Sequence, residues 1–336
     1  MRPLRLLLLA LLAAPLLGSG LLSAAIGPWH DDGPARVRLI SPWAEGPAGG
    51  ELWLGLEIAL APGWHSYWRN SGDAGYPPRV DLAETPGLGE VELLFPVPER
   101  YDLPGDLVAF GYEESVVYPL RTRADFGSAA AVAVRGQVDY VVCASECIPF
   151  TSPLALDQPL AATPREDPAG AERLAAFRAR LPGPLPASGS VALRLLENGA
   201  AGGSFELAAA GLPAAPAELF FAPHDLVELG RPERRATEGG ARFTVPFSWR
   251  DRSRTPPSLD LDWTLALPPG GVAGAATLPL APPLAPPLAI VEPSAAAGED
   301  SGARQATRWP WIALAAVILL GLVWALWPRS TDRRAA

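Results

Sequence analysis

Hydrophobic and polar residues alternate in the first half of the chain, as they do in half-buried β-strands. In the clearest case, Glu51–Leu60, every second residue from Leu52 to Leu60 is apolar. Shorter segments of the same kind follow between glycine- and proline-containing turns: Arg36–Ser41, Glu90–Phe95, Leu107–Phe110, Ser115–Arg121, Ala131–Arg135 and Gln137–Val142. Several short strands punctuated in this way predict an antiparallel β-sandwich over residues 26–160.

Residues 161–184 interrupt the strand pattern and predict a linker with a short helix. Leu174, Phe177 and Leu181 have helical spacing within Ala169–Leu181, and Pro182 follows directly. Strand patterns then resume at Ser190–Leu196, Ala217–Ala222, Arg242–Trp249 and Leu259–Leu267. We therefore expect an all-β protein with a second, smaller β-sandwich over residues 185–280.

The N-terminal end of the chain has the pattern of a secretory signal peptide over residues 1–25. Arg2 and Arg5 precede an apolar run, and Ser23-Ala24-Ala25 offers small residues at the cleavage positions. The alternative is an uncleaved membrane anchor. Either reading places the rest of the chain in a compartment where disulfides form.

The other end contains an uncharged stretch of 17 residues, Trp311–Trp327, at the lower limit for a bilayer span. We expect a transmembrane helix at 309–328, with tryptophans at both ends, after a Pro/Ala-rich spacer at 281–308. The alternative is a buried core helix. Three arginines in the tail, residues 329–336, predict a cytoplasmic C-terminus by the positive-inside rule. The protein would thus be single-pass, with its bulk outside the cytoplasm.

Composition excludes several function classes. The chain has 336 residues, a net charge of −9 and no lysine, so no basic stripe is available for nucleic acid. Three scattered histidines and one methionine do not make a metal centre, and we expect neither a metal nor a cofactor. His224 and Asp225 complete no catalytic triad, and no phosphate-binding loop is present. The two cysteines remain as the candidate reactive residues.

Cys143 and Cys147 lie in the segment YVVCASECIPF. Residues four apart in one strand are about 13 Å apart, whereas a disulfide needs Cα atoms within about 7 Å. If the two bond, the chain must turn at residues 144–146. Val141-Val142 before the turn and Ile148 after it suit the arms of a hairpin, and Pro149 argues against a helical turn.

Spacing leaves the role of such a bridge open. As a structural staple it would contribute only about 2 kcal/mol, because the closed loop is small. As a redox site it is unlike the C-x-x-C of thioredoxin-like proteins, and Glu146 disfavours a thiolate beside it. The cysteine pair is better suited to being reduced by one partner protein and reoxidised by another than to starting exchange by nucleophilic attack on a disulfide.

Three segments in this order resemble a known family. GWHSYWRNSGDAGYPP (Gly63–Pro78), FGYEESVVYPL (Phe110–Leu120) and YVVCASECIPF (Tyr140–Phe150) are similar to the periplasmic N-terminal region of DsbD-type thiol:disulfide interchange proteins, most of all to the ScsB-like branch. The resemblance is good over about residues 30–160 and only general over 185–280. It implies two immunoglobulin-like β-sandwiches.

The same resemblance implies a function. Cys143 and Cys147 would be a catalytic pair that accepts electrons from the membrane and passes them to periplasmic thioredoxin-fold proteins. The chain shows neither the multi-span nor the C-terminal thioredoxin-like domain of the family, so a separate membrane electron-transporting protein is expected as donor. Residues 309–328 would hold the module at the inner membrane. The alternative is a non-catalytic binding module with a structural disulfide.

A few other residues have two readings each. The aromatic loop after Ala61 either caps the disulfide or forms a partner-docking surface, or else is a packed sandwich edge; it contains Trp64, His65, Tyr67, Trp68 and Tyr76. His65 could perturb a thiol or be structural. Arg69 and Asp73 could form a loop ion pair, Tyr140 is expected in the core, and Pro149 is expected to end its hairpin arm.

Overall fold

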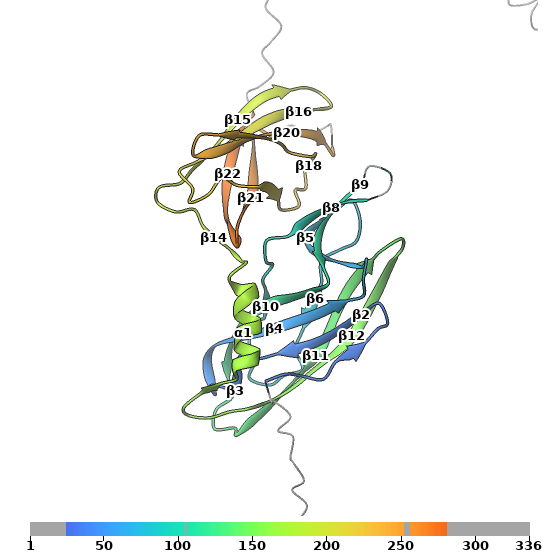
Figure 1. Cartoon of the computed structure of the whole chain (residues 1–336), viewed down its shortest axis with the longest axis vertical. Helices are drawn as coiled ribbons and strands as arrows, with labels where there is room; N and C mark the ends of the chain where they lie inside the picture. Colours follow the sequence, from blue (N-terminus) through green and yellow to red (C-terminus); the bar gives the residue numbers. More distant parts are fainter. Residues whose placement is uncertain (1–24, 104, 106, 252–255, 281–336) are drawn as a thin grey trace, which may run out of the picture. The chain divides into compact units, whose positions relative to one another are not determined.

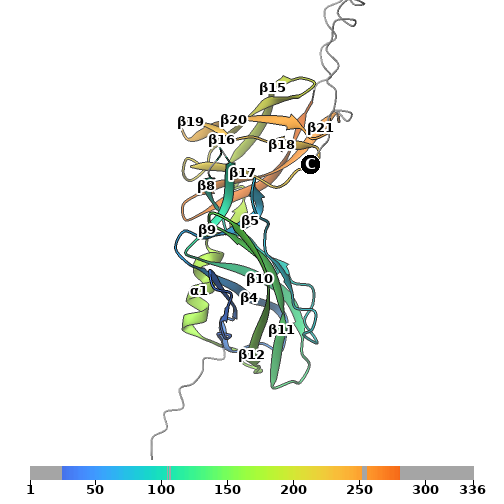
Figure 2. The ribbon, with the colours of Figure 1, turned by 90° about the vertical axis from the view of Figure 1, so that its right-hand side faces the viewer.

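The computed structural model describes residues 25–103, 105, 107–251 and 256–280, all within one compact unit that ends at Leu284. Its regular structure is almost entirely β, which confirms the expected all-β class, and the strands form two stacks of sheets (Figures 1 and 2). The predicted signal peptide lies outside the described residues except for Ala25, which is buried. The spacer, the 309–328 helix and the tail also lie outside them. Within the described residues, no helix is long and apolar enough to span a bilayer.

The first sandwich, the stack at lower sequence numbers, is built from two sheets. One sheet has the strand order β1 (His30–Asp31), β2 (Ala35–Ile40), β4 (Gly49–Leu60), β10 (Ser115–Asp125), β7 (Glu92–Leu93). The other has the order β12 (Cys147–Pro159), β11 (Ala131–Cys143), β5 (His65–Gly72), β9 (Leu107–Glu113), β8 (Glu99–Leu103), with β6 (Arg79–Asp81) also paired to β11. A small ribbon joins β3 (Trp43–Glu45) to β13 (Arg165–Glu166).

The core of the first sandwich lies between these sheets, as the alternating pattern predicts. Leu52, Leu54 and Leu56 of β4 are buried there, facing Val138 and Tyr140 of β11. The outer face of the same sheet is covered by helix α1 (Pro168–Arg178), which packs mainly against β10, with Leu174 buried beside Ile40 of β2 and Val117 of β10. The predicted linker helix is therefore present, three residues shorter at its C-terminal end than the helical spacing suggested.

A buried charge cluster fastens helix α1 to the sheet. Glu57 of β4 is 1% exposed and accepts a hydrogen bond from Arg38 Nε at 2.6 Å and another from Arg173 on the helix. Asp167 caps the helix by accepting from Gly170 N at 2.8 Å. A buried carboxylate between two guanidinium groups is satisfied, whereas an unpaired one would be strongly destabilising.

The second sandwich also consists of two sheets around a hydrophobic core that includes Phe205, Phe243 and Trp263. One sheet has the order β14 (Pro182–Pro184), β22 (Gly270–Pro279), β21 (Ser258–Leu267), β17 (Glu218–Phe221). The other has the order β15 (Ser190–Asn198), β16 (Gly202–Ala210), β20 (Gly240–Trp249), β18 (Val227–Leu229), with β19 (Glu233–Thr237) also paired to β20. All pairings are antiparallel except β14 with β22.

Three local expectations were wrong. Residues 131–135 and 137–142 form the single strand β11, because Gly136 has no Cβ and so lets Asp81 O of β6 approach. Pro149 does not end its arm: β12 runs on to Pro159, since it is an edge strand in which missing N–H groups are tolerated. Most of the expected aromatic loop is strand β5, because it pairs with β9 and β11.

Candidate functional site: the disulfide hairpin

The two cysteines close the hairpin formed by β11 and β12. The strands pair in register along their whole length, and Cys143 stands opposite Cys147. The two sulfurs are bonded, and their Cα atoms are 4.1 Å apart. Ala144 N donates to Glu146 O at 3.0 Å and tightens the three-residue turn. The turn that the sequence required for a bridge is therefore confirmed.

The two halves of the disulfide differ in exposure. Cys147 is exposed, together with the turn residues before it, whereas Cys143 is 4% exposed. Cys143 packs in a small apolar cluster with Tyr67 of β5, Ala109 of β9 and Val141, and Tyr101 borders the same cluster. One residue of the bridge is therefore exposed while the other is enclosed by the protein.

His65 is the polar neighbour of Cys143. It stands directly opposite Cys143 in the β5–β11 pairing, and its Nδ1 lies 3.2 Å from Cys143 O. On its other side His65 stands opposite Glu113 in the β5–β9 pairing, and its Nε2 lies 2.9 Å from Glu113 Oε1. The ring of Tyr101 covers the imidazole edge-on, with ring centroids 4.4 Å apart.

The two tyrosines that pack near the disulfide, Tyr67 and Tyr101, are uncharged at neutral pH. Burial raises the pKa of Tyr67 to about 12. Burial also raises the pKa of Tyr101, and the negative charges of Glu99 and Glu113 raise it further. Neither phenol ionises near neutral pH. His65 is therefore the remaining ionisable side chain in contact with Cys143, and Glu113 in turn contacts His65.

Some aromatic residues of the predicted loop are packed in the sandwich, and others lie near the disulfide or at the surface. Tyr67 and Trp68 are each 1% exposed, which supports packing, and Tyr67 also lies against the disulfide. Tyr76 is exposed and lines a surface hollow of about 630 Å³ with Pro149 and Phe150 of β12. This hollow adjoins the strand that carries Cys147.

Sequence reasoning missed Glu113 and Tyr101 as neighbours of the bridge. Glu113 lies within the segment FGYEESVVYPL, so the motif marked its neighbourhood without giving it a role. Tyr101 comes from β8, a strand that no alternation predicted. Its position depends on the β8–β9 hairpin, which brings it against β5.

The Arg69–Asp73 ion pair is not formed. Arg69 instead donates to Thr264 Oγ1 at 3.2 Å, and Asp73 Oδ2 accepts from Val108 N at 2.7 Å. Tyr140 is in the core as expected, and its hydroxyl donates to Asp32 Oδ2 at 2.7 Å. His224 Nδ1 accepts from Leu226 N at 3.1 Å, so this nitrogen has a local structural role.

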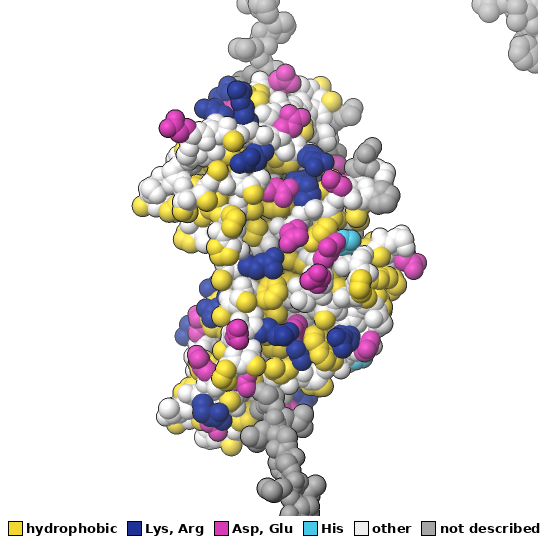
Figure 3. Space-filling view, in the orientation of Figure 1, with side chains coloured by type: hydrophobic (Ala, Val, Ile, Leu, Met, Phe, Trp, Pro, Cys, Tyr) yellow, Lys and Arg dark blue, Asp and Glu magenta, His cyan; other side chains and the backbone are white. Residues whose placement is uncertain are grey.

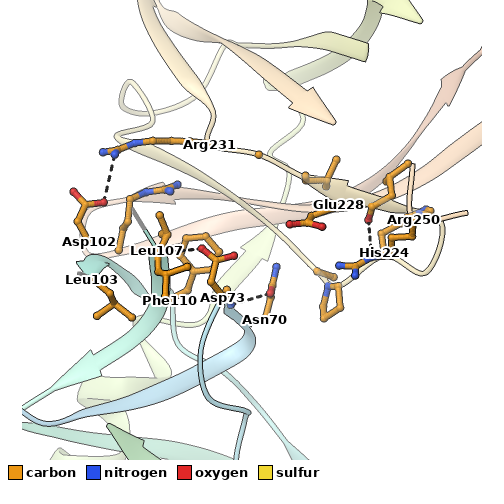
Figure 4. A pocket seen from close by; sticks show the side chains of 18 residues that line it. Asn70, Asp73, Asp102, Leu103, Leu107, Phe110, His224, Glu228, Arg231 and Arg250 are labelled. Carbon is orange, nitrogen blue, oxygen red and sulfur yellow. Dashed lines mark hydrogen bonds and ion pairs between the residues drawn. The ribbon is translucent and has the colours of Figure 1, made fainter. Parts of the chain in front are cut away.

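A larger cleft of about 690 Å³ lies beyond the β8–β9 hairpin and is lined from both sandwiches (Figure 4). Asp102 and Arg231 form an ion pair across it at 3.3 Å. Acidic and basic side chains are interspersed on the face shown in Figure 3. Nothing among the described lining residues forms a nucleophile–base pair, so the disulfide remains the candidate for chemistry.

Comparisons with known proteins agree with this choice. Residues 36–159 match the family model "Thiol:disulfide interchange protein DsbD, N-terminal". The fold is similar to the crystal structure of the N-terminal periplasmic domain of ScsB from Proteus mirabilis, with a TM-score of 0.59 and 20% sequence identity. That similarity covers 76% of this chain and 98% of the other. No curated protein matches the chain.

The family match contains the whole cysteine hairpin. The resemblance of this region to a DsbD-type N-terminal domain, first indicated by three short motifs, is therefore confirmed. The structural similarity extends the likeness in fold, though not in chemistry, to the second sandwich.

Proposed function

We propose that the DsbD-type domain at residues 36–159 is a thiol:disulfide interchange module whose Cys143–Cys147 pair cycles between disulfide and dithiol. The observation that supports this most directly is the asymmetry of the bridge, with an exposed Cys147 and a buried Cys143. A staple needs neither sulfur at the surface, whereas exchange needs one accessible sulfur and a second that resolves the intermediate.

The asymmetry assigns a role to each sulfur. Exchange proceeds through a mixed disulfide, and access decides which sulfur meets the partner. Cys147 forms the mixed disulfide, because it is the one that another protein can reach. Cys143 resolves it from within the apolar cluster of Tyr67, Ala109 and Val141. Apolar surroundings disfavour a free thiolate at Cys143 and so favour its return to the disulfide.

The partners follow from the family resemblance. The module accepts electrons from a separate membrane electron-transporting protein and passes them to periplasmic thioredoxin-fold proteins. The surface hollow at β12 reaches Pro149, two residues beyond Cys147, and offers such a partner a mixed surface, lined by Tyr76, Arg79, Asp139, Pro149, Phe150 and Thr151.

The membrane tether is part of the same proposal. Residues 309–328 anchor the protein in the inner membrane as a single span, with the β-sandwiches in the periplasm and residues 329–336 in the cytoplasm. A reporter that is active only in the cytoplasm, fused after Ala336, should be active. Activity of a periplasm-specific reporter at the same position would contradict this topology.

The reduction potential of the bridge tests the function. Structural disulfides in secreted proteins usually lie below about −300 mV, while exchange partners lie well above this value. We expect the full-length chain, equilibrated with glutathione buffers and quantified by thiol alkylation, to be reduced within the range of periplasmic exchange proteins. A bridge that resists these buffers would favour the alternative, a binding module with a structural disulfide.

A further inference from the structure

Strand β17 of the second sandwich contributes one side chain to the core of the first. Leu219 and Phe221 of this strand pack in the core of their own sandwich. Phe220, between them, is 1% exposed and belongs to the core cluster of the first sandwich. Successive side chains of a strand point to opposite faces. This alternation therefore turns Phe220 away from its own sandwich and into the neighbouring one.

The side chains around Phe220 come from three neighbouring strands of one sheet. Its ring centroid lies 5.8 Å from that of Trp68 on β5 and 5.4 Å from that of Phe110 on β9. The guanidinium carbon of Arg100 on β8 lies 6.0 Å from the centroid of the Phe220 ring and 5.0 Å from that of Phe110. A single aromatic side chain of the second sandwich thus supports β5, β9 and β8 together.

The same three strands carry the residues that enclose Cys143, on their other face. In the β8–β9 register Arg100 is opposite Phe110 and Tyr101 is opposite Ala109, so the two pairs point to opposite sides of the sheet. Ala109 packs in the apolar cluster of Cys143, and Tyr101 borders that cluster. Each strand therefore has one residue toward Cys143 and the next residue along the chain toward Phe220. These neighbours are Tyr67 and Trp68 on β5, Tyr101 and Arg100 on β8, and Ala109 and Phe110 on β9.

An ion pair beside Phe220 fixes β17 to β8. Glu218 precedes Phe220 by two residues, so both side chains point to the same face of β17. Glu218 accepts a hydrogen bond from Arg100 Nε, and the Arg100 side chain is only 9% exposed. A guanidinium buried to this extent needs a partner, because an unpaired buried charge is strongly destabilising. The pair therefore holds the Phe220 side of β17 against β8.

Two polar side chains of β5 bind the same part of the second sandwich. Arg69 Nη2 donates to Thr264 Oγ1 at 3.2 Å, and Asn70 Nδ2 donates to Phe221 O at 2.9 Å. Thr264 stands directly opposite Phe220 in the pairing of β17 with β21. These bonds surround the Phe220 ring and keep it against β5.

We propose that Phe220 is a positioning residue for the disulfide, which supports β5, β8 and β9 from behind and so keeps Cys143 enclosed. The inference rests on the proposed redox function, in which Cys147 alone meets the partner, and it gives the second sandwich a part in that function. Truncation of a buried aromatic ring leaves a cavity that weakens the contacts around it. Loss of the ring therefore makes local opening of the three strands more frequent and lets reagents reach Cys143.

The rate of alkylation by iodoacetamide at neutral pH measures how well Cys143 is enclosed. In the full-length Cys147→Ser variant, Cys143 is the single thiol of the chain. Adding Phe220→Ala should raise its alkylation rate about tenfold, and Phe220→Leu should restore most of the protection, because it keeps an apolar side chain in the site. In the Cys143→Ser variant, the exposed Cys147 should react at the same rate with and without Phe220→Ala.

Phe243→Ala is the matched control. Phe243 is also 1% exposed, but it packs in the core of the second sandwich. The same truncation there reduces stability without removing support from β5, β8 and β9, so the alkylation rate of Cys143 should change by less than about twofold. Equal acceleration by Phe220→Ala and Phe243→Ala would reduce the effect to general stability and overturn the positioning role. No acceleration by Phe220→Ala would overturn it as well.

A milder pair of variants decides the matter if thermal melts show that Phe220→Ala is unfolded. Glu218→Gln removes the ion pair with Arg100 and should raise the alkylation rate of Cys143 about threefold. Glu206→Gln is its control, because Glu206 pairs with Arg194 and Arg242 inside the second sandwich, and the rate should stay unchanged. Equal rates in Glu218→Gln and Glu206→Gln would contradict the proposal.

Exchange with glutathione separates this proposal from the redox function itself. If the wild-type protein exchanges normally while Phe220→Ala leaves the alkylation rate of Cys143 unchanged, the role of Phe220 is overturned and the function is intact. If the wild-type protein does not exchange with glutathione, the proposed function is overturned, whatever the alkylation rates are.

Discussion

Each sandwich contains a long hairpin, and the strand ends of the two hairpins have different surroundings. In the first sandwich, β11 and β12 end at Cys143 and Cys147, and the turn between them is exposed. In the second, β21 and β22 end at Leu267 opposite Gly270; Pro268 and Pro269 of the turn are exposed, but the strand residues beside them are packed. A Cβ on Gly270 would lie 2.7 Å from Ala179 O, next to helix α1, and one on Gly271 would lie 2.8 Å from Val97 Cγ2 of the first sandwich.

The two hairpins show that strand register comes from the hairpin itself, whereas burial of its end comes from the neighbouring strands. Both turns bring two strand ends into register, so either could hold opposed cysteines. Only the first places one strand end in solvent while β5, β8 and β9 enclose the other. In the proposed function, reactivity at the first hairpin arises from this asymmetric covering, whereas the second hairpin serves as packing surface between the sandwiches.

The largest expected effect concerns the two sulfurs. A Cys143→Ser variant leaves the exposed Cys147 free, and a Cys147→Ser variant leaves the buried Cys143. We expect Cys147 to react with a chromogenic aromatic disulfide about a hundredfold faster than Cys143, because access and thiolate character control the rate. Both variants should lose turnover completely. Equal rates in the two variants would show that the difference in burial does not control reactivity.

Alkaline pH should destabilise the first sandwich selectively. All six tyrosines lie between residues 67 and 140, and burial raises the pKa of five of them, that of Tyr67 to about 12. A raised folded-state pKa gives stability that is complete below the unfolded value near 10 and is lost as pH rises through the folded value. For Tyr67 alone the loss reaches about 3 kcal/mol above pH 12, and about half of that is present near pH 11.

Urea unfolding at neutral pH and near pH 11 measures this effect, and tyrosine absorbance reports the first sandwich alone. Tyr67→Phe should reduce the alkaline loss. The exposed Tyr76 offers a matched control, since Tyr76→Phe should leave the loss unchanged. Parallel weakening of the second sandwich, which contains no tyrosine, would contradict the assignment to these phenols.

The packed hairpin end should not tolerate side chains. Gly271→Ala places a methyl group 2.5 Å from Leu265 O and against Val97, so we expect a loss of about 2–3 kcal/mol in the free energy of unfolding. Gly183→Ala in the adjoining strand β14 is the matched control, because no atom lies within 4 Å of the added Cβ. Chemical denaturation measures both, and glutathione exchange at Cys147 should stay normal in both. A neutral Gly271→Ala would show that this end is loosely packed.

The smallest effect should come from reducing the bridge. The loop between Cys143 and Cys147 is short, so its loss costs no more than about 2 kcal/mol, and a domain of this size should stay folded. Calorimetry of the oxidised and reduced forms should show a modest drop in melting temperature. Unfolding of residues 26–280 under mild reductant would indicate a structural staple instead.

Much of the site follows from local sequence. The alternation in β4 predicts which side chains enter the core, and the four-residue spacing of the cysteines demands a turn between them. The segment with helical spacing yields α1, and the three motifs indicate the resemblance to a DsbD-type N-terminal domain that the family model matches over residues 36–159. These features are readable because each depends on residues close together in the chain.

Long-range pairing decided the rest. His65 and Cys143 are 78 residues apart and become neighbours only because β5 pairs with β11. Arg69 bonds Thr264 rather than nearby Asp73 for a similar reason, since the second sandwich supplies a partner that local sequence does not reveal. Alternation tells which face a residue occupies, but it does not tell which strand lies alongside.

The sequence by itself therefore determined the β-class, the hairpin and the pair of sulfurs that it can join. Only the tertiary structure decided that Cys143 is enclosed, that Cys147 is exposed, and that the His65 imidazole, beside Glu113, stands opposite Cys143. The physical reason is that burial and cross-strand neighbours are properties of the assembled sheets. They arise from β5, β8 and β9, whose positions against the hairpin are set by register and packing across the whole sandwich.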